Sequence, residues 1–144
     1  MLYVLQHSCQ RLYLLKLLRC QGLPLDSLSI VCVALLISRL TYAISAWGGF
    51  CSAADVGRIN SFLKRVVKYG FLTKFADFNS YLDQADSRLF KCMCHSDHCL
   101  HILLPALKPV VCQKLRQRTH LYTLPKYRYE LFKKSFLLRC LYNF

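Results

Sequence analysis

Cysteine and histidine side chains crowd one short stretch of the chain, and they have the most evident capacity for chemistry. Six potential metal ligands fall within ten residues, namely Cys92, Cys94, His95, His98, Cys99 and His101. A zinc ion needs four ligands in tetrahedral positions, often supplied as two pairs separated by a dozen or more residues. The pairs in this stretch are too close together for such a loop. We therefore expect no metal site and no cofactor, with a zinc-binding module around 92–101 as an alternative interpretation.

Nucleophilic catalysis by a cysteine is the second chemistry that this stretch suggests. Cys99 directly follows His98, so a nucleophile and a base are adjacent in the sequence. Adjacent side chains rarely point toward each other, and no oxyanion donor or third catalytic partner can be identified. We expect no catalytic residue here.

Positive charge is the third feature with a chemical meaning. The chain of 144 residues has 20 Lys and Arg against 7 Asp and Glu, a formal net charge of +13. An excess of this size indicates a polyanionic partner, either nucleic acid or an acidic membrane face. Seven basic residues are candidates for phosphate contacts: Arg58, Lys64, Arg65 and Lys68 in one predicted helix, and Arg11, Lys16 and Arg19 in another. Acids are almost absent beside them, whereas a merely solubilising face usually mixes both signs.

Four helices are expected to position these residues. The spacing of apolar residues predicts helices over 2–20, 52–69 and 78–94, and a long central helix that starts near Asp26 and ends at Gly48-Gly49. Within 52–69, Ser52 is the expected N-cap and the expected buried face contains Val56, Ile59, Phe62, Leu63, Val66 and Val67. A further short helix is expected near Tyr129 to Tyr142. The predicted fold is mainly α, a small helical bundle with an irregular, partly extended basic C-terminal tail.

The central segment differs from the other predicted helices because it is apolar on all sides. Such a helix is buried all round, either by protein or by lipid. We expect burial by protein, with Asp26 as a cap and Trp47 filling a large core site. The alternative is a small basic membrane-associated protein with residues 30–47 in lipid, a length just sufficient to span. Arg39 near the middle of that span would cost about 2.5–3.5 kcal/mol.

The nine cysteines are scattered and odd in number, which does not suggest a disulfide framework. The first 18 residues are apolar but contain Arg11 and Lys16, and no small-residue cleavage site follows them, so they do not resemble a signal peptide. We therefore expect reduced cysteines and an intracellular protein, in the cytoplasm, the nucleus or both.

Several segments, taken in their order along the chain, resemble one family of polymerases. They are Gln10 to Arg19, Ser38 to Trp47, Ile59 to Arg65, Arg128 to Phe136 and Leu141 to Phe144. Together they resemble the C-terminal part of LINE-type, jockey-like non-LTR retrotransposon reverse transcriptases, after the catalytic palm. The resemblance makes the three-helix unit over 1–70 thumb-like. From the residues themselves we expect a fourth helix and Cys/His turn over 71–109 and a basic aromatic tail over 110–144.

The resemblance also implies an RNA-directed DNA polymerase of a transposable element, of which this chain would be a non-catalytic fragment. Polymerase chemistry needs paired carboxylates that hold two divalent ions, and the family supplies them from a Phe/Tyr-Ala-Asp-Asp turn upstream of the similar region. The stretch Phe75 to Phe78 has only one acid, Asp77, and it follows the thumb-like helices. We therefore expect no enzymatic activity. The expected partner is RNA or RNA–DNA duplex, bound through its backbone without sequence preference and without a membrane.

Overall fold

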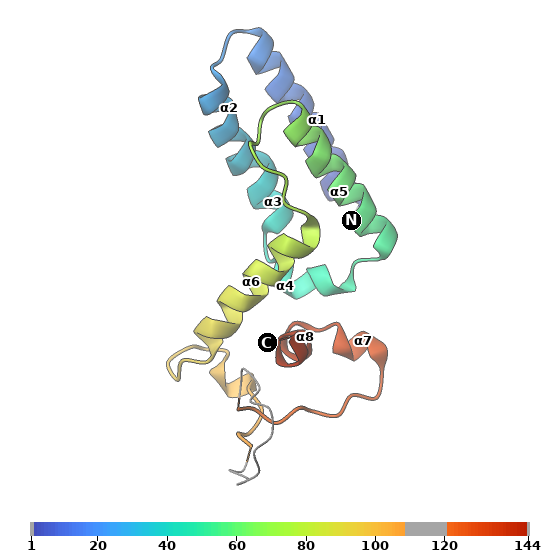
Figure 1. Cartoon of the computed structure of the whole chain (residues 1–144), viewed down its shortest axis with the longest axis vertical. Coiled ribbons are helices and arrows are strands. Elements are labelled where there is room, and N and C mark those ends of the chain that lie inside the picture. Colours follow the sequence, from blue (N-terminus) through green and yellow to red (C-terminus); the bar gives the residue numbers. More distant parts are fainter. Residues whose placement is uncertain (1, 109–120, 144) are drawn as a thin grey trace. The chain divides into compact units, whose positions relative to one another are not determined.

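The computed structural model describes residues 2–108 and 121–143, and it confirms a mainly α-helical fold (Figure 1). No strand occurs in these two ranges, although a single antiparallel bridge joins Leu107 to Tyr122. The chain forms two compact units. Unit 1 comprises Met1–Ile44 and Cys51–Leu82, and unit 2 comprises Ser45–Phe50 and Asp83–Phe144.

Unit 1 is a small bundle built around helix α1 (Leu2–Cys20). The chain turns at Gly22, which has a positive φ of 90°, and returns as α2 (Leu25–Cys32), the π-helical turn η1 (Val33–Ile37) and α3 (Ser38–Thr41). Helix α5 (Ala53–Lys68) packs against α1 and runs in the same direction (Figure 1). The helices predicted over 2–20 and 52–69 are thereby confirmed.

The core of unit 1 comes from one face of each helix. The fully buried side chains include Leu15 of α1, Leu28 and Cys32 of α2, Leu36 of η1, Ile59, Phe62 and Val66 of α5, and Phe71 after it. Burial of an aliphatic or aromatic side chain of this size stabilises the folded state by about 1.5–3 kcal/mol. Of the apolar face predicted for α5, four residues are buried and two, Val56 and Val67, are half-buried. The face is confirmed in its central part.

The prediction of one central helix buried on every side is wrong. The segment is interrupted by η1, and it breaks at Tyr42 and Ala43, whose φ is +48°. Short helices α4 (Ile44–Trp47) and η2 (Gly48–Phe50) follow the break. The side chain of Ile30 is 72 % exposed. An apolar sequence on all faces therefore does not correspond to burial on all faces.

Side-chain hydroxyls give a physical reason for the irregular helix. Ser38 Oγ donates to the carbonyl of Ala34, and Thr41 Oγ1 donates to the carbonyl of Ile37 at 2.9 Å. Hydrogen bonds from a hydroxyl to the carbonyl four residues earlier compete with the helix ladder and often bend helices. The expected cap was also wrong, because Pro24 occupies the N-cap position and no side chain caps α2.

Helix α6 (Phe78–Met93) begins in unit 1 and ends in unit 2, and it confirms the helix predicted over 78–94. In unit 2 it is followed by η3 (His101–Leu103), α7 (Glu130–Lys133) and α8 (Phe136–Asn143). Phe90, Cys140 and Leu141 form the core of this unit, covered by Leu104, Tyr122, Leu124, Phe136 and Leu137. The single helix predicted near the C-terminus is therefore two helices.

A buried ion pair lies within unit 2. Asp86 is only 2 % exposed, and its carboxylate accepts two hydrogen bonds from Arg139, from Nε at 2.6 Å and from Nη2 at 3.0 Å. The same guanidinium donates to the carbonyl of Ser45 at 2.9 Å and to that of Lys134 at 2.7 Å. Arg139 thus joins three separate segments of unit 2.

Trp47 does not have the core position that we expected. Its side chain is half-buried, and the largest fully buried side chains of the described chain are Phe62 and Phe71. The residue lies in the short helix after the break at Ala43, so the interrupted helix places it differently from a continuous one. The first part of the basic tail, including Lys114, Arg116 and Arg118, lies outside the described residues.

Candidate nucleic-acid interface

The basic residues of α5 are presented by a well-defined amphipathic helix. Ser52 caps it, because its Oγ accepts from the backbone N–H of Asp55 at 3.1 Å and donates to the Asp55 carboxylate at 2.7 Å. One face of the helix is anchored in the core. The side chains of Arg58, Lys64, Arg65 and Lys68 are exposed. At 1.5 Å per residue the first and last of these are about 15 Å apart along the helix axis.

Four of the seven candidate residues come together around Tyr69, at the C-terminal end of α5. The Lys16 ammonium lies 3.7 Å from the centroid of the Tyr69 ring, and Arg19 Nη1 donates to the Tyr69 carbonyl at 2.7 Å. The pKa of the Tyr69 phenol is lowered, first by its hydrogen bond with Lys16 and the charge of that residue, then by the charges of Arg65 and Lys68. Lys16, Arg19, Arg65 and Lys68 with Tyr69 form what we call the Tyr69 cluster.

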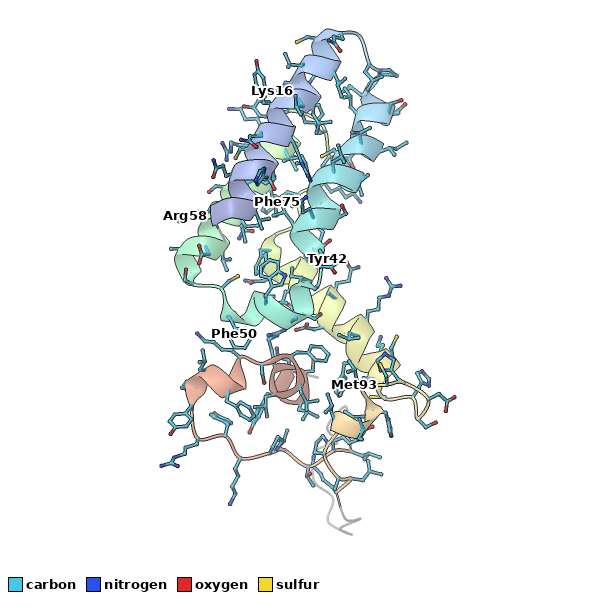
Figure 2. All side chains as sticks on the ribbon, turned by 180° about the vertical axis from the view of Figure 1, so that it is seen from behind. Lys16, Tyr42, Phe50, Arg58, Phe75 and Met93 are labelled. Carbon is cyan, nitrogen blue, oxygen red and sulfur yellow. The ribbon has the colours of Figure 1, made fainter. Side chains whose placement is uncertain are left out.

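A shallow groove between α1 and α5 extends the basic surface toward the start of α5. Its lining comes from Leu5, Gln6 and Cys9 of α1 and from Ala54, Gly57, Arg58, Ser61 and Arg65 of α5. Arg65 Nη2 lies 3.7 Å from the thiol of Cys9 across the groove. Lys16 on α1 and Arg58 on α5 are labelled in Figure 2. Because Arg58 and Arg65 both line the groove, it connects Arg58 to the Tyr69 cluster.

In the described part of the chain, none of these cations lies within 4.0 Å of a carboxylate. Within the described ranges the one ion pair closer than 4.0 Å is that of Arg139 with Asp86 in unit 2. The nearest acid on α5, Asp55, is engaged with Ser52 at the helix N-terminus. Unneutralised charges of one sign on neighbouring helices create a positive potential that attracts polyanions.

Two candidate residues have other contacts in unit 1. Arg11 Nη1 donates to the carbonyl of Leu35 at 2.9 Å, so Arg11 connects α1 to η1 and is not part of the Tyr69 cluster. The Lys64 ammonium lies 5.8 Å from the centroid of the Phe75 ring. A role in phosphate binding remains a prediction for all seven residues.

Two features, Tyr69 at the end of α5 and the buried Asp86, were not predicted, although the sequence contains evidence for each. Tyr69 follows Lys68 at a helix end, and aromatic residues adjacent to cations occur often in nucleic-acid interfaces. Asp86 lies four residues after Leu82 and four before Phe90, which places a carboxylate on the buried stripe of a helix. A buried carboxylate needs a charged partner, so this spacing predicts an ion pair.

The Cys/His stretch forms a turn with local hydrogen bonds. His98 Nδ1 accepts from the backbone N–H of Leu100 at 3.2 Å, and His101 Nδ1 lies 3.0 Å from the Met93 carbonyl. In the part of the chain that the structure describes, no three His, Cys, Asp or Glu side chains gather as metal ligands would. Asp77 of the stretch Phe75 to Phe78 accepts from the Ser80 N–H at 3.2 Å and so caps α6.

Comparison with known proteins finds no match to this chain among family models, curated proteins or solved structures. Inference of function therefore depends on the basic surface of unit 1 and on the resemblance of the sequence segments.

Proposed function

We propose that unit 1 binds the sugar–phosphate backbone of RNA or of an RNA–DNA duplex, without sequence preference. The observation that carries this proposal is the Tyr69 cluster, in which two helices bring four cations to one place with no carboxylate of the described residues within 4.0 Å. Maintaining such a concentration of like charge is unfavourable in a protein that has no anionic ligand. A bound phosphate backbone would neutralise it.

The residue types fit backbone contact better than base reading. Lysine acts as a flexible point charge, and arginine can donate to two phosphate oxygens at once. The cations lie on an open helical surface and along a shallow groove, so bases need not enter a fitted pocket. Contacts of this kind fix position and supply affinity but carry no sequence information.

We further propose that the chain is a non-catalytic fragment of a LINE-type, jockey-like non-LTR retrotransposon reverse transcriptase, with unit 1 acting as its thumb. The ordered segments from Gln10 to Phe144 support this proposal. Four of the seven acids have structural contacts: Asp55 and Asp77 at helix N-termini, Asp86 in the buried ion pair, and Asp97, which accepts from the Ser96 hydroxyl. In this proposal the paired carboxylates of polymerase chemistry come from a separate, upstream region.

A membrane-associated protein is the second candidate function, and one observation favours it. The segment Leu25–Phe50 is long and apolar enough to span a membrane by length and composition, and only 33 % of its most apolar 18 residues is buried within the protein. The segment nevertheless contains exposed Arg39 and a break at Ala43. Cell fractionation separates the two candidates, because a membrane-spanning protein resists extraction by salt and a nucleic-acid-binding protein does not.

The test of the main proposal is a salt titration of binding. The full chain should bind an RNA–DNA duplex with a log affinity that falls linearly with log salt, by about 0.9 for each phosphate neutralised. Four contacts from the Tyr69 cluster give a slope of about −3.6. Duplexes of unrelated sequence should show the same affinity and slope. A slope near zero, or affinities that differ tenfold between sequences, would contradict backbone binding.

A further inference from the structure

A second surface, in unit 2, combines exposed aromatic rings with cations. It is made of Tyr127, Arg128 and Tyr129 in the segment before α7, Phe132 and Lys133 in α7, and Tyr142 in α8. We call this set the aromatic–basic surface. None of its residues belongs to the unit that carries the proposed backbone-binding site.

One part of the aromatic–basic surface is held in place by its own contacts. The rings of Tyr127 and Tyr142 meet edge to face, with centroids 5.7 Å apart and an interplanar angle of 83°. The ammonium of Lys133 lies 5.5 Å from the first centroid and 5.9 Å from the second. The Tyr142 hydroxyl donates to the carbonyl of Pro125 at 3.3 Å. These contacts fix a cation between two rings.

The other part presents open rings. The side chain of Tyr129 is 65 % exposed and that of Phe132 is 58 % exposed. Arg128 is close to the first of these rings, with its guanidinium carbon 5.7 Å from the Tyr129 centroid. Both open rings therefore offer a face to a planar group, and at Tyr129 a cation lies nearby.

The charge around these rings is strongly positive. Lys126, Arg128, Lys133 and Lys134 are exposed, and Glu130 is the one acid among residues 126–134. No cation of this segment lies within 4.0 Å of a carboxylate in the described chain. A partner that fits must therefore offer both anionic groups and planar rings.

We propose that the aromatic–basic surface binds single-stranded nucleic acid, whose bases stack on Tyr129 and Phe132 while its phosphates contact the neighbouring cations. A single strand offers unstacked bases and closely spaced phosphates, whereas a duplex keeps its bases inside its own stack. Aromatic side chains interleaved with Lys and Arg are the usual means of binding single strands without sequence preference. This inference concerns a different unit from the proposed duplex contact and can fail or succeed independently of it.

The test compares the affinity of the full chain for a 12-nucleotide oligouridylate with its affinity for an RNA–DNA duplex. The double variant Tyr129→Ala/Phe132→Ala should weaken oligouridylate binding about tenfold or more, because two stacking platforms are lost. Its duplex affinity should change less than twofold. Circular dichroism should be unchanged, since both side chains are exposed.

Two matched variants separate stacking from simple apolar contact. Leu131→Ala removes a side chain that is also 65 % exposed in α7 but has no ring, and it should change oligouridylate affinity less than twofold. Tyr129→Phe/Phe132→Tyr keeps both rings and should retain wild-type affinity. If Leu131→Ala weakens binding as much as the double alanine variant, or if the ring-keeping variant loses the same affinity, stacking is contradicted.

A vesicle experiment tests whether an anionic membrane, instead of nucleic acid, is the partner of this surface. If the double alanine variant loses binding to phosphatidylserine vesicles and keeps its oligouridylate affinity, the surface serves a membrane and the proposal is wrong. Failure of the duplex contact has a different signature, because duplex binding is then absent while oligouridylate binding still depends on the two rings.

Discussion

At the scale of single residues, the strongest constraint in unit 2 is the pair of Asp86 with Arg139. The carboxylate is fully buried and both of its oxygens accept from the guanidinium. Gly49 lies so close to this guanidinium and to the Lys134 carbonyl that a Cβ at position 49 would overlap both. The pair therefore organises backbone from three segments, and any substitution that removes one partner leaves the other charge without its counter-ion.

Asp86→Ala should be among the most destabilising single changes in the chain. Removing one partner of a buried ion pair typically costs about 3–5 kcal/mol, and because Arg139 keeps 12 % exposure and two carbonyl acceptors, we expect about 3 kcal/mol. Urea denaturation measures the change in the free energy of unfolding. Asp83→Ala, an exposed acid on the same helix, is the control and should change it by less than about 0.5 kcal/mol. Equal effects of the two variants would show that the pair contributes nothing.

At the scale of elements, α5 is the helix whose sequence agrees best with its structure, although Val56 and Val67 of its predicted face are only half-buried. It has a capping serine, an acid in the first turn, an apolar stripe in the core and basic residues in the last turn. Its end is also conventional, because Gly70 adopts a φ of 77° and the Phe71 N–H donates to the Val66 carbonyl. This regularity fixes the direction in which the basic side chains point.

Loss of the α5 cap should be measurable in thermal or urea unfolding. Ser52→Ala removes the acceptor for the Asp55 N–H and should destabilise unit 1 by about 1 kcal/mol. Ser61→Ala on the same helix is the control, since its hydroxyl only donates back to the Gly57 carbonyl. That variant should be neutral or slightly stabilising, because alanine has the higher helix propensity. A cap variant as stable as the control would contradict the role of Ser52.

The contrast between α5 and the segment 25–50 shows what sequence patterns can predict. The two-sided pattern of 52–69 specified both the helix and its buried face. The segment 25–50 lacks a polar face, so its pattern could not show which side is covered, and Ile30 remained exposed. The positive φ at Ala43 was unpredictable because alanine has no preference for that conformation.

The basic residues of the candidate site could be predicted from the sequence, but their arrangement around Tyr69 could not. Charge counting identified the basic residues of α1 and α5, since few acids accompany them. The convergence of Lys16, Arg19, Arg65 and Lys68 on Tyr69 depends on the packing of two helices in the same direction, which no local pattern specifies. The same packing decides that Arg11 contacts Leu35 instead.

At the scale of the whole molecule, the large positive charge needs an explanation in terms of function. The formal net charge is +13, yet the described chain contains a single ion pair, and that pair is buried in unit 2. Among the described residues, the cations of unit 1 thus repel one another without a carboxylate within 4.0 Å. We propose that a phosphate backbone supplies the compensation, with the Tyr69 cluster as its principal contact.

A charge-reversal experiment on the RNA–DNA duplex tests this claim most directly. Arg65→Glu/Lys68→Glu changes the Tyr69 cluster, and Arg88→Glu/Lys91→Glu changes two exposed cations with the same spacing on α6. Each double variant lowers the net charge from +13 by the same four units. The α5 variant should lower affinity and reduce the salt slope by about two units, at about 0.9 for each lost phosphate contact, and the α6 variant should keep the wild-type slope. Equal slopes for the two variants would contradict a specific role of the α1–α5 surface.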